Sequence, residues 1–216
     1  MSTIRKCLLC QVELNKQSLM QYLMNDSLCA VCRASLRIRK RTIQMKKLKV
    51  TSFGLYENEL ADALIQYKEC MDEALKDMFL FDVKDWIRFH YHNCVFLCAP
   101  SSQKNLERRG FQHVISMFEQ CGIEILDCFE KIGDVSQKEA SLKERTEISD
   151  VLVLKKDVQL PEKRLVLIDD TVTTGNTLFA LQKLLGEKRC SEALCLCIHP
   201  KLLTEYDKKF RKKRIY

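Results

Sequence analysis

The sequence predicts an α/β protein with a parallel β-sheet, preceded by a small metal-binding module. Three observations support this prediction. From about Thr51 onward, short apolar runs alternate with stretches of helical periodicity, which is typical of a parallel sheet covered by helices on both faces. Two Cys-x2-Cys pairs stand before that pattern begins. At 216 residues, the chain has room for one full α/β domain and a small accessory module.

Four cysteines near the N-terminus have the spacing of a structural zinc site. Cys7 and Cys10 form one pair, Cys29 and Cys32 form the other, and 18 residues separate the pairs. Two such knuckles complete a tetrahedral shell of thiolates around Zn²⁺ with no open position for catalysis. Redox chemistry by one pair is the alternative, but no βαβ pattern surrounds it. We expect residues 1–48 to be a zinc-binding module with a basic segment, and residues 49–216 to be the main domain.

The start of the chain leads into no apolar signal sequence, and no apolar run is long enough to span a bilayer. We therefore expect a cytoplasmic protein whose cysteines are reduced or bound to metal rather than paired in disulfides. The eight other cysteines lie mostly in apolar segments, where a thiol acts as a small buried hydrophobic group.

The formal net charge is +7, and much of the excess lies in two clusters. Eight basic residues and no acidic one occur from Arg33 to Lys49, and six more occur from Lys208 to Arg214. Such runs suit a polyanion such as nucleic acid. A solvated helix face or a frayed terminus is the alternative for either cluster. The candidate nucleic-acid-binding residues are Arg33, Arg37, Arg39, Lys40, Arg41, Lys46 and Lys47.

The main domain alternates predicted helices and strands. Helical spacing of apolar residues marks the regions 60–65, 75–86, 112–121 and 177–188. Apolar runs that read as buried strands cover residues 95–99, 124–126, 165–168 and 193–198. Residues 131–150 are strongly charged and lack a large apolar face, so we expect a long excursion of the kind that often forms a lid.

The segment after the strand at 165–168 carries the clearest functional signal. It has two carboxylates, then threonines, a glycine and an asparagine, and then a helix with one apolar stripe. A hydroxyl-rich turn at a helix N-terminus favours a phosphate group, because unpaired N–H donors and partial positive charge meet there. The carboxylates suit ribose hydroxyls or a magnesium ion. The predicted ligand residues are Asp169, Asp170, Thr171, Thr173, Thr174, Gly175, Asn176 and Thr177.

Other nucleotide-binding motifs are excluded. The chain has six glycines and contains neither Gly-x-Gly-x-x-Gly nor Gly-x4-Gly-Lys-Ser/Thr, which argues against a dinucleotide oxidoreductase and a P-loop ATPase. In a plainer reading of the same segment, the threonines and asparagine only cap the helix and the aspartates only end the strand. The length of the whole pattern favours the ribose-phosphate reading.

These motifs together resemble a known family. Val166 to Thr177 resembles the phosphoribosyl pyrophosphate loop of type I phosphoribosyltransferases. The four cysteines before it resemble those of the ComF late-competence family of bacterial DNA-uptake proteins. Supporting stretches are Tyr56 with Ile65-Gln66-Tyr67-Lys68, Cys98-Ala99-Pro100 through Arg108-Arg109-Gly110-Phe111, and Gln137, Leu142, Glu144 and Arg145 in the predicted lid. The sequence departs from the family pattern at Ala99, at Gln112-His113 and at Thr171.

The resemblance implies a type I phosphoribosyltransferase-like fold behind a zinc ribbon. It also implies that Lys104, Arg108 and Arg109 lie near the pyrophosphate of a ligand bound with Mg²⁺. The implied function is that of a competence accessory protein that binds phosphoribosyl pyrophosphate and single-stranded DNA and works beside a DNA-uptake helicase. An active phosphoribosyltransferase that salvages a nucleobase is the alternative, although no base-selecting segment is recognisable.

Overall fold

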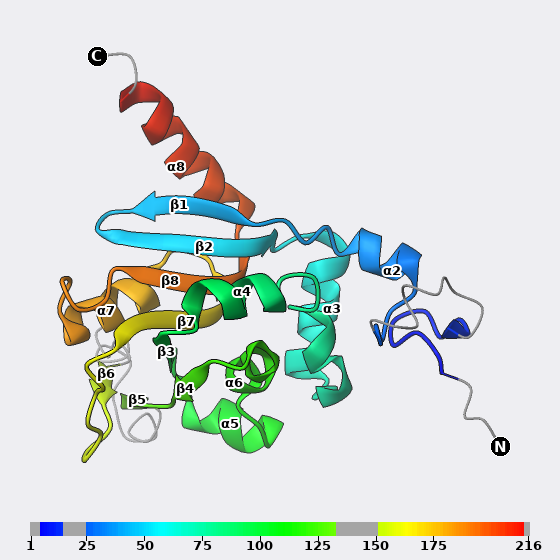
Figure 1. Ribbon diagram of the computed structural model, residues 1–216, viewed down its shortest axis with the longest axis horizontal. Helices are drawn as coiled ribbons and strands as arrows, with labels where there is room; N and C mark the ends of the chain where they lie inside the picture. Colours follow the sequence, from blue (N-terminus) through cyan, green and yellow to red (C-terminus); the bar gives the residue numbers. More distant parts are fainter. Residues whose placement is uncertain (1–4, 15–24, 133–150, 214–216) are drawn as a thin grey trace, which may run out of the picture.

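A six-stranded sheet forms the centre of the protein (Figure 1). The computed structural model describes residues 5–14, 25–132 and 151–213. The strand order is β1-β2-β8-β7-β3-β4. The strands are β1 (Arg41–Met45), β2 (Leu48–Leu55), β3 (Cys94–Cys98), β4 (Glu124–Leu126), β7 (Arg164–Val172) and β8 (Glu192–Ile198).

Along the spatial order β2-β8-β7-β3-β4, every pair of neighbouring strands is parallel. The edge strand β1 pairs with β2 in an antiparallel hairpin. A predominantly parallel sheet needs crossover connections, and helices provide them. The predicted α/β class with a parallel sheet is therefore confirmed. Because the parallel strands share one direction, the segments after β2, β3, β7 and β8 meet at one edge of the sheet, which is where open α/β sheets bind ligands.

Helices cover both faces of the sheet, and each face has its own core. One core contains residues of α3 (Asn58–Glu69), the 3₁₀ helix η2 (Glu73–Met78), α4 (Lys84–Tyr91) and α6 (His113–Phe118). The other contains residues of α7 (Asn176–Leu185) and α8 (Pro200–Lys213). The remaining elements are α5 (Gln103–Arg109), the 3₁₀ helix η3 (Glu119–Cys121) and the two-stranded sheet of β5 (Phe129–Ile132) and β6 (Val151–Leu154).

Strand alternation explains why the central strands read as continuous apolar runs. In β7, Val166 and Ile168 pack against α3, α4 and α6, whereas Leu165 and Leu167 pack on the opposite face. Because both faces are covered, successive side chains are all buried. At roughly 25 cal/mol per Å² of apolar surface removed from water, this two-sided burial is the main stabilising contribution to the fold.

The N-terminal module lies at one end of the molecule, beyond α2 (Ala30–Ser35) (Figure 1). A bridge between Lys6 and Glu13 closes its first turn. Cys7, Leu28 and Leu36 are buried and belong to the same apolar core as α3 and η2. The module therefore packs on the main domain instead of forming a separate core.

The boundary that we expected at residue 48 falls inside the β1–β2 hairpin. β1 begins at Arg41 and is the edge strand of the main sheet. The reason is that Ile43, Met45, Leu48 and Val50 are buried against the sheet while the basic residues between them face solvent. Along the described part of the chain, no helix combines the length and the apolar character required to cross a bilayer.

Candidate phosphate site and basic surface

The predicted phosphate loop, residues 169–177, connects β7 to α7. The sequence prediction ended the strand at residue 168, but β7 continues to Val172, so both carboxylates lie within it. Pairing of Asp169 with Cys195 and of Thr171 with Cys197 in β8 extends the strand. The side chains of Asp169 and Asp170 thus leave opposite faces of the sheet. The turn itself covers residues 173–175, and Gly175 precedes α7.

Asp170 is buried and held by a lysine and a histidine. Its Oδ2 accepts from Lys68 Nζ at 2.5 Å and from His113 Nε2 at 2.9 Å. Lys68 comes from the end of α3 and His113 from the start of α6. Burial alone would raise the pKa of Asp170, but the hydrogen bond from His113 and the charge of Lys68 hold that pKa well below its usual range. The structure thus keeps Asp170 ionised.

Asp169 has the opposite character. Burial, together with the charge of neighbouring Asp170, raises the pKa of Asp169 to about 8. Its Oδ1 accepts from the Asp170 backbone N–H at 2.9 Å. A carboxyl that is still mostly protonated at neutral pH, with its pKa only slightly above it, loses its proton readily when a cation or a hydrogen-bond donor arrives. Asp170 thus carries a fixed negative charge, whereas the protonation state of Asp169 can change.

The predicted pyrophosphate-side residues occupy α5 and differ in environment. Arg109 is buried and donates to Lys68 O at 2.9 Å and to Glu69 at 3.0 Å, and its guanidinium lies 3.1 Å from His113 Nδ1. Arg108 pairs with the same Glu69. Lys104 is exposed and makes no hydrogen bond or ion pair within the described ranges. Arg109 therefore supports the Asp170 network, while Lys104 is accessible to a ligand.

The loop encloses only a small pocket. It measures about 30 Å³ and is lined by Asp169 and by residues 171–178. Gly175 has φ +80°, and a Cβ there would lie 2.5 Å from Met45 Cε and 3.3 Å from Phe179, so glycine permits the turn. The Thr171 hydroxyl is buried and has no hydrogen-bond partner in the described chain. A pocket of this size holds at most one small group, so the rest of a ligand would lie along the sheet edge.

The four N-terminal cysteines come together as the sequence predicts. Their sulfur atoms all lie within 4.8 Å of one another, and Cys10 Sγ and Cys29 Sγ are 3.7 Å apart. Two thiolates on one tetrahedral Zn²⁺ at ~2.3 Å would be about 3.8 Å apart. Backbone N–H groups donate to two of the sulfurs, Cys29 N to Cys7 at 3.3 Å and Cys32 N to Cys29 at 3.4 Å. The donor set and its spacing fit a structural zinc ion.

Comparison with known proteins agrees with these motifs. The chain is 30% identical over 132 residues to the competence protein ComFC of Streptococcus pneumoniae (strain ATCC BAA-255 / R6). The resemblance to the ComF family is thereby confirmed. The match covers 61% of this chain and 59% of that protein, so the matched part spans about three-fifths of the relative's length.

No protein-family model matches the chain. Among solved structures, a purine phosphoribosyltransferase from Pyrococcus horikoshii Ot3 is 17% identical, with a TM-score of 0.34, and the match covers 58% of this chain and 73% of that one. A likeness of this size adds nothing to the α/β fold that the sheet topology already defines.

Several ComF-like residues lie outside the described residues. Gln137, Leu142, Glu144 and Arg145 of the expected lid all fall within 133–150. In the basic tail, the side chains from Lys208 to Lys213 are likewise not described, nor is Arg214.

Sequence reasoning missed the residues that hold Asp170. His113 appeared only as a departure from the family pattern, and Lys68 only as part of a matching stretch. Their role depends on a meeting of α3, α5 and α6 at one sheet edge, which no local pattern encodes. A polar residue at the first position of an otherwise apolar helix, as at His113, is the signal that was available.

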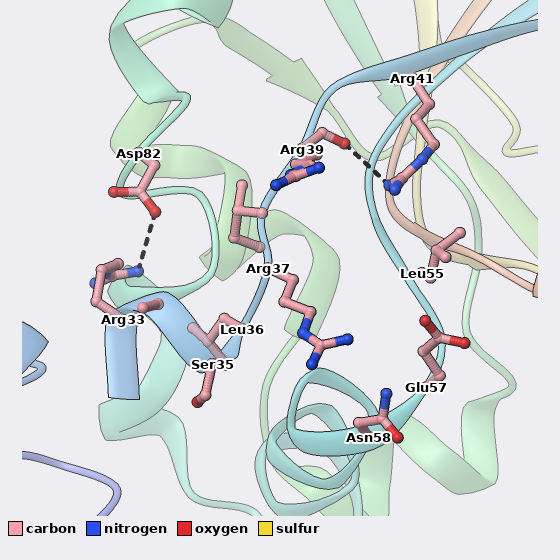
Figure 2. Close-up of a pocket in the computed structure, with 12 residues that line it drawn as sticks. Arg33, Ser35, Leu36, Arg37, Arg39, Arg41, Leu55, Glu57, Asn58 and Asp82 are labelled. Atoms are coloured by element: carbon pink, nitrogen blue, oxygen red, sulfur yellow. Dashed lines mark hydrogen bonds and ion pairs between the residues drawn. The ribbon is translucent and has the colours of Figure 1, made fainter. Parts of the chain in front are cut away.

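The basic segment forms one wall of a large pocket at the end of β2 (Figure 2). The pocket measures about 650 Å³, within the range of small-ligand sites. Arg37, Arg39 and Arg41 line it and have no carboxylate within ion-pair distance among the described residues. Leu36, Ile38 and Leu55 supply apolar wall, and Glu57 and Asp82 supply acidic groups. Figure 2 shows the Arg37 side chain extending into the pocket on the side of Asn58.

Arg33 differs from the other arginines of this segment. Its side chain is only 12% exposed. It donates to both Asp26 oxygens, at 2.5 and 2.9 Å, and to Met78 O at 2.5 Å. Since Met78 ends η2, Arg33 fastens the N-terminal module to the main domain. These contacts occupy its guanidinium within the protein, so Arg33 is less accessible to a nucleic-acid phosphate than the exposed Arg37 and Arg39.

The remaining basic residues of the segment are exposed and differ in their neighbours. Lys40 lies over the Trp86 ring at 4.0 Å, and Lys46 lies over the Phe179 ring at 4.3 Å. Lys47 pairs with Glu187 at 2.5 Å, and Lys49 pairs with Glu192 at 3.3 Å. The unpaired positive charge is therefore concentrated on residues 37–41, near the pocket.

Proposed function

We propose that this protein binds phosphoribosyl pyrophosphate with Mg²⁺ at the phosphate loop and single-stranded DNA on its basic segment, as an accessory protein of DNA uptake during competence. The relative from Streptococcus pneumoniae is a competence protein, which supports a role in competence. The observation that carries the ligand assignment is the pair of carboxylates at the end of β7, one fixed as an anion and one adjustable, beside a threonine-rich turn that leads into α7.

The chemistry of the ligand matches these groups. Ribose hydroxyls donate to an ionised carboxylate, and Asp170 is held in that form by Lys68 and His113. The 5′-phosphate would lie in the turn at residues 173–175, where the N-terminus of α7 favours negative charge. Mg²⁺ would neutralise the pyrophosphate, with Lys104 as the accessible cation of α5. Among the proposed ligand residues, Thr171 has its hydroxyl buried, so its backbone is the part offered to the ligand.

Calorimetric titration tests the ligand assignment. Phosphoribosyl pyrophosphate with Mg²⁺ is titrated into the zinc-loaded protein and into Asp169→Asn/Asp170→Asn, and thermal unfolding confirms that the variant folds. We expect the double substitution to weaken binding by at least about tenfold, since it removes two charge-assisted interactions. Asp62→Asn, on an exposed position of α3, is the control. Equal affinity of wild type and double variant would overturn the assignment.

A pyrophosphate-release assay separates binding from transfer. If any nucleobase triggers stoichiometric release from the bound ligand, the protein is an active phosphoribosyltransferase and not a ligand-binding accessory. We expect no release, because no segment of the sequence reads as a base-selecting hood.

The DNA half of the proposal rests on residues 37–41. Arginine contacts to phosphates release counterions, so log affinity should fall linearly with log salt, by about 0.7 per contacted phosphate of a single strand. Arg37→Ala/Arg39→Ala/Arg41→Ala should therefore lower this slope by roughly 2. Lys76→Ala/Lys155→Ala/Lys163→Ala removes the same charge from lysines that are already paired with carboxylates. If both triple variants change the slope equally, only net charge matters.

The uptake helicase is the proposed protein partner. Co-purification of the helicase with wild type but not with a variant lacking the zinc module would support a direct contact. Equal recovery of the helicase with both proteins would mean that the zinc module does not contact it.

A further inference from the structure

An aromatic cluster on α4 extends from the fold core into solvent: Trp86 packs against the core and contacts Phe53, whereas its neighbours Phe89 and His90 are exposed. The Trp86 and His90 rings are 4.2 Å apart and inclined by 32°, and Phe89 meets His90 edge-on at 5.3 Å. Lys40 Nζ lies over the Trp86 ring at 4.0 Å. The His90 Nδ1–H donates to Trp86 O at 2.8 Å, which fixes the ring against the tryptophan. The four side chains form one continuous surface, the α4 platform.

Exposure makes this cluster unusual. Phe89 is 76% exposed, whereas Ile87 and Tyr91 of the same helix are buried. The helix therefore already has its apolar face in the core, and Phe89 lies on the solvent side together with His90. A phenylalanine left in water forgoes most of the stabilisation that its burial would contribute. A cluster of three neighbouring rings at one exposed place suggests a ligand with flat apolar faces.

The platform adjoins the arginine pocket through the backbone of residues 39–41. Arg39 and Arg41 line the pocket, while Lys40 between them contacts Trp86. Successive side chains along this segment thus serve two adjacent surfaces. Lys40 is the cation that contacts the platform directly, and Asp85, one helical turn before Phe89, is paired with Arg88 at 3.5 Å. Flat rings beside unpaired cations complement a ligand with bases and phosphates.

We propose that Phe89 and His90, supported by Trp86, stack against bases of a single DNA strand whose phosphates lie on Arg37, Arg39 and Arg41. This inference rests on the proposed DNA binding and names the contact that selects single strands. In a duplex the base faces are covered by their neighbours, whereas an unpaired strand offers them to aromatic side chains. Stacking of this kind tolerates any sequence, because every base has a π-face.

The single tryptophan of the chain makes the platform directly observable. Oligo-dT is titrated into the full-length, zinc-loaded protein at low salt while Trp86 fluorescence is recorded. We expect saturable quenching. Phe89→Ala should weaken binding by roughly 5-fold or more, the range for one base–aromatic stack. Phe89→Tyr should bind like wild type and Phe89→Leu like the alanine variant, because the aromatic face and not apolar bulk is required.

An abasic oligomer of equal length separates the two surfaces, since it keeps the phosphates and lacks the bases. Wild type should prefer oligo-dT over the abasic strand, and Phe89→Ala should lose most of that preference without a change in salt slope.

DNA binding with unchanged Trp86 fluorescence and equal affinity of wild type and Phe89→Ala would overturn the platform alone. No binding of either oligomer by wild type would instead overturn the proposed DNA function. Light scattering that shows a dimer dissociating in Phe89→Ala, with DNA affinity intact, would assign this face to a second copy of the chain.

Discussion

Asp169 and Asp170 are neighbours in β7, yet their surroundings give them opposite titration behaviour. Asp170 is stabilised as an anion by His113 and Lys68. Asp169 has no such cation in direct contact and faces the charge of Asp170, so burial and repulsion raise its pKa to about 8. Ionisation of Asp169 is thus unfavourable in the free protein and becomes favourable when a ligand or a cation arrives.

Asp169→Asn should stabilise the ligand-free protein, and the gain should grow with pH. The folded pKa is about 8 and an unfolded aspartate titrates near 4. The folded chain thus retains a proton that the unfolded chain loses, so wild-type stability falls as pH rises from about 4 to about 8. We expect a gain of roughly 1–3 kcal/mol near pH 8 and little near pH 4.

Urea unfolding of Asp169→Asn at about pH 4, 6 and 8 measures this gain. Asp62→Asn, which changes an exposed carboxylate of α3, is the control and should show no trend with pH. A gain for Asp169→Asn that is the same at all three pH values would mean that Asp169 ionises normally in the free protein.

At the scale of elements, the turn before α7 depends on Gly175. Gly110 provides a matched comparison, because it also has a positive φ but would place a Cβ in open space. Gly110→Ala should cost about 1 kcal/mol from the backbone alone. Gly175→Ala also brings its Cβ within 2.5 Å of Met45 Cε, the flexible end of a buried side chain, and within 3.3 Å of the Phe179 ring, so we expect up to about 1 kcal/mol more and weaker ligand binding. Chemical unfolding and calorimetry of both variants test this, and equal costs would contradict the clash.

The four-cysteine cluster predicts one zinc ion per chain. Cys10→Ser removes an exposed ligand, while Cys70→Ser changes an exposed cysteine outside the cluster. Elemental analysis should show zinc lost in the first variant and retained in the second. Hydrogen exchange should accelerate in residues 25–36 of Cys10→Ser, since metal binding stabilises such a module. Zinc content equal to wild type in Cys10→Ser would refute the site.

The elements that could be predicted from the sequence are those with strong periodicity. The four expected strands correspond to β3, β4, β7 and β8, and the region 112–121 corresponds to α6 and η3. The β1–β2 hairpin was not predicted, because its exposed basic residues were interpreted as a nucleic-acid-binding segment. The alternating apolar residues Ile43, Met45, Leu48 and Val50 were the strand signal. The turn of the hairpin also lacks the usual signal, since Lys46 adopts φ 55° without being Gly or Asn. β7 was cut short because two carboxylates rarely continue a buried strand.

Within the site, local motifs predicted the loop and the cysteine cluster but not their supports. The turn residues 173–175 are contiguous in sequence, and the four cysteines form two Cys-x2-Cys pairs. Lys68, Arg109 and His113 come from three helices and meet only through the fold. The same limit hid the role of Arg33, whose partner Met78 lies 45 residues away. Long-range pairing is what the sequence alone could not supply.

At the scale of the whole molecule, both proposed ligand sites open on one edge of the sheet. The phosphate loop follows β7, and the pocket residues Leu55, Glu57 and Asn58 end β2 or follow it. Only β8 lies between these two strands, so the strand ends that lead to the two sites are two strand spacings, about 10 Å, apart. That distance is close to the screening length at physiological salt. Two anionic ligands bound together would therefore repel each other weakly.

Simultaneous binding should accordingly be possible and mildly antagonistic. One charge pair about 10 Å apart in water costs about 0.4 kcal/mol, so several pairs should weaken oligo-dT binding roughly 2- to 5-fold at low salt when phosphoribosyl pyrophosphate and Mg²⁺ are saturating. By linkage, oligo-dT must weaken the affinity for phosphoribosyl pyrophosphate by the same factor. Raising the salt should remove the effect, because the screening length shortens. Anisotropy titrations of oligo-dT at two salt concentrations measure the factor. The control is the Asp169→Asn/Asp170→Asn protein, with phosphoribosyl pyrophosphate at a concentration that saturates the wild type but not this variant. If oligo-dT and phosphoribosyl pyrophosphate exclude each other completely at both salt concentrations, the two ligands share residues. If phosphoribosyl pyrophosphate instead enhances DNA binding, it orders the basic surface.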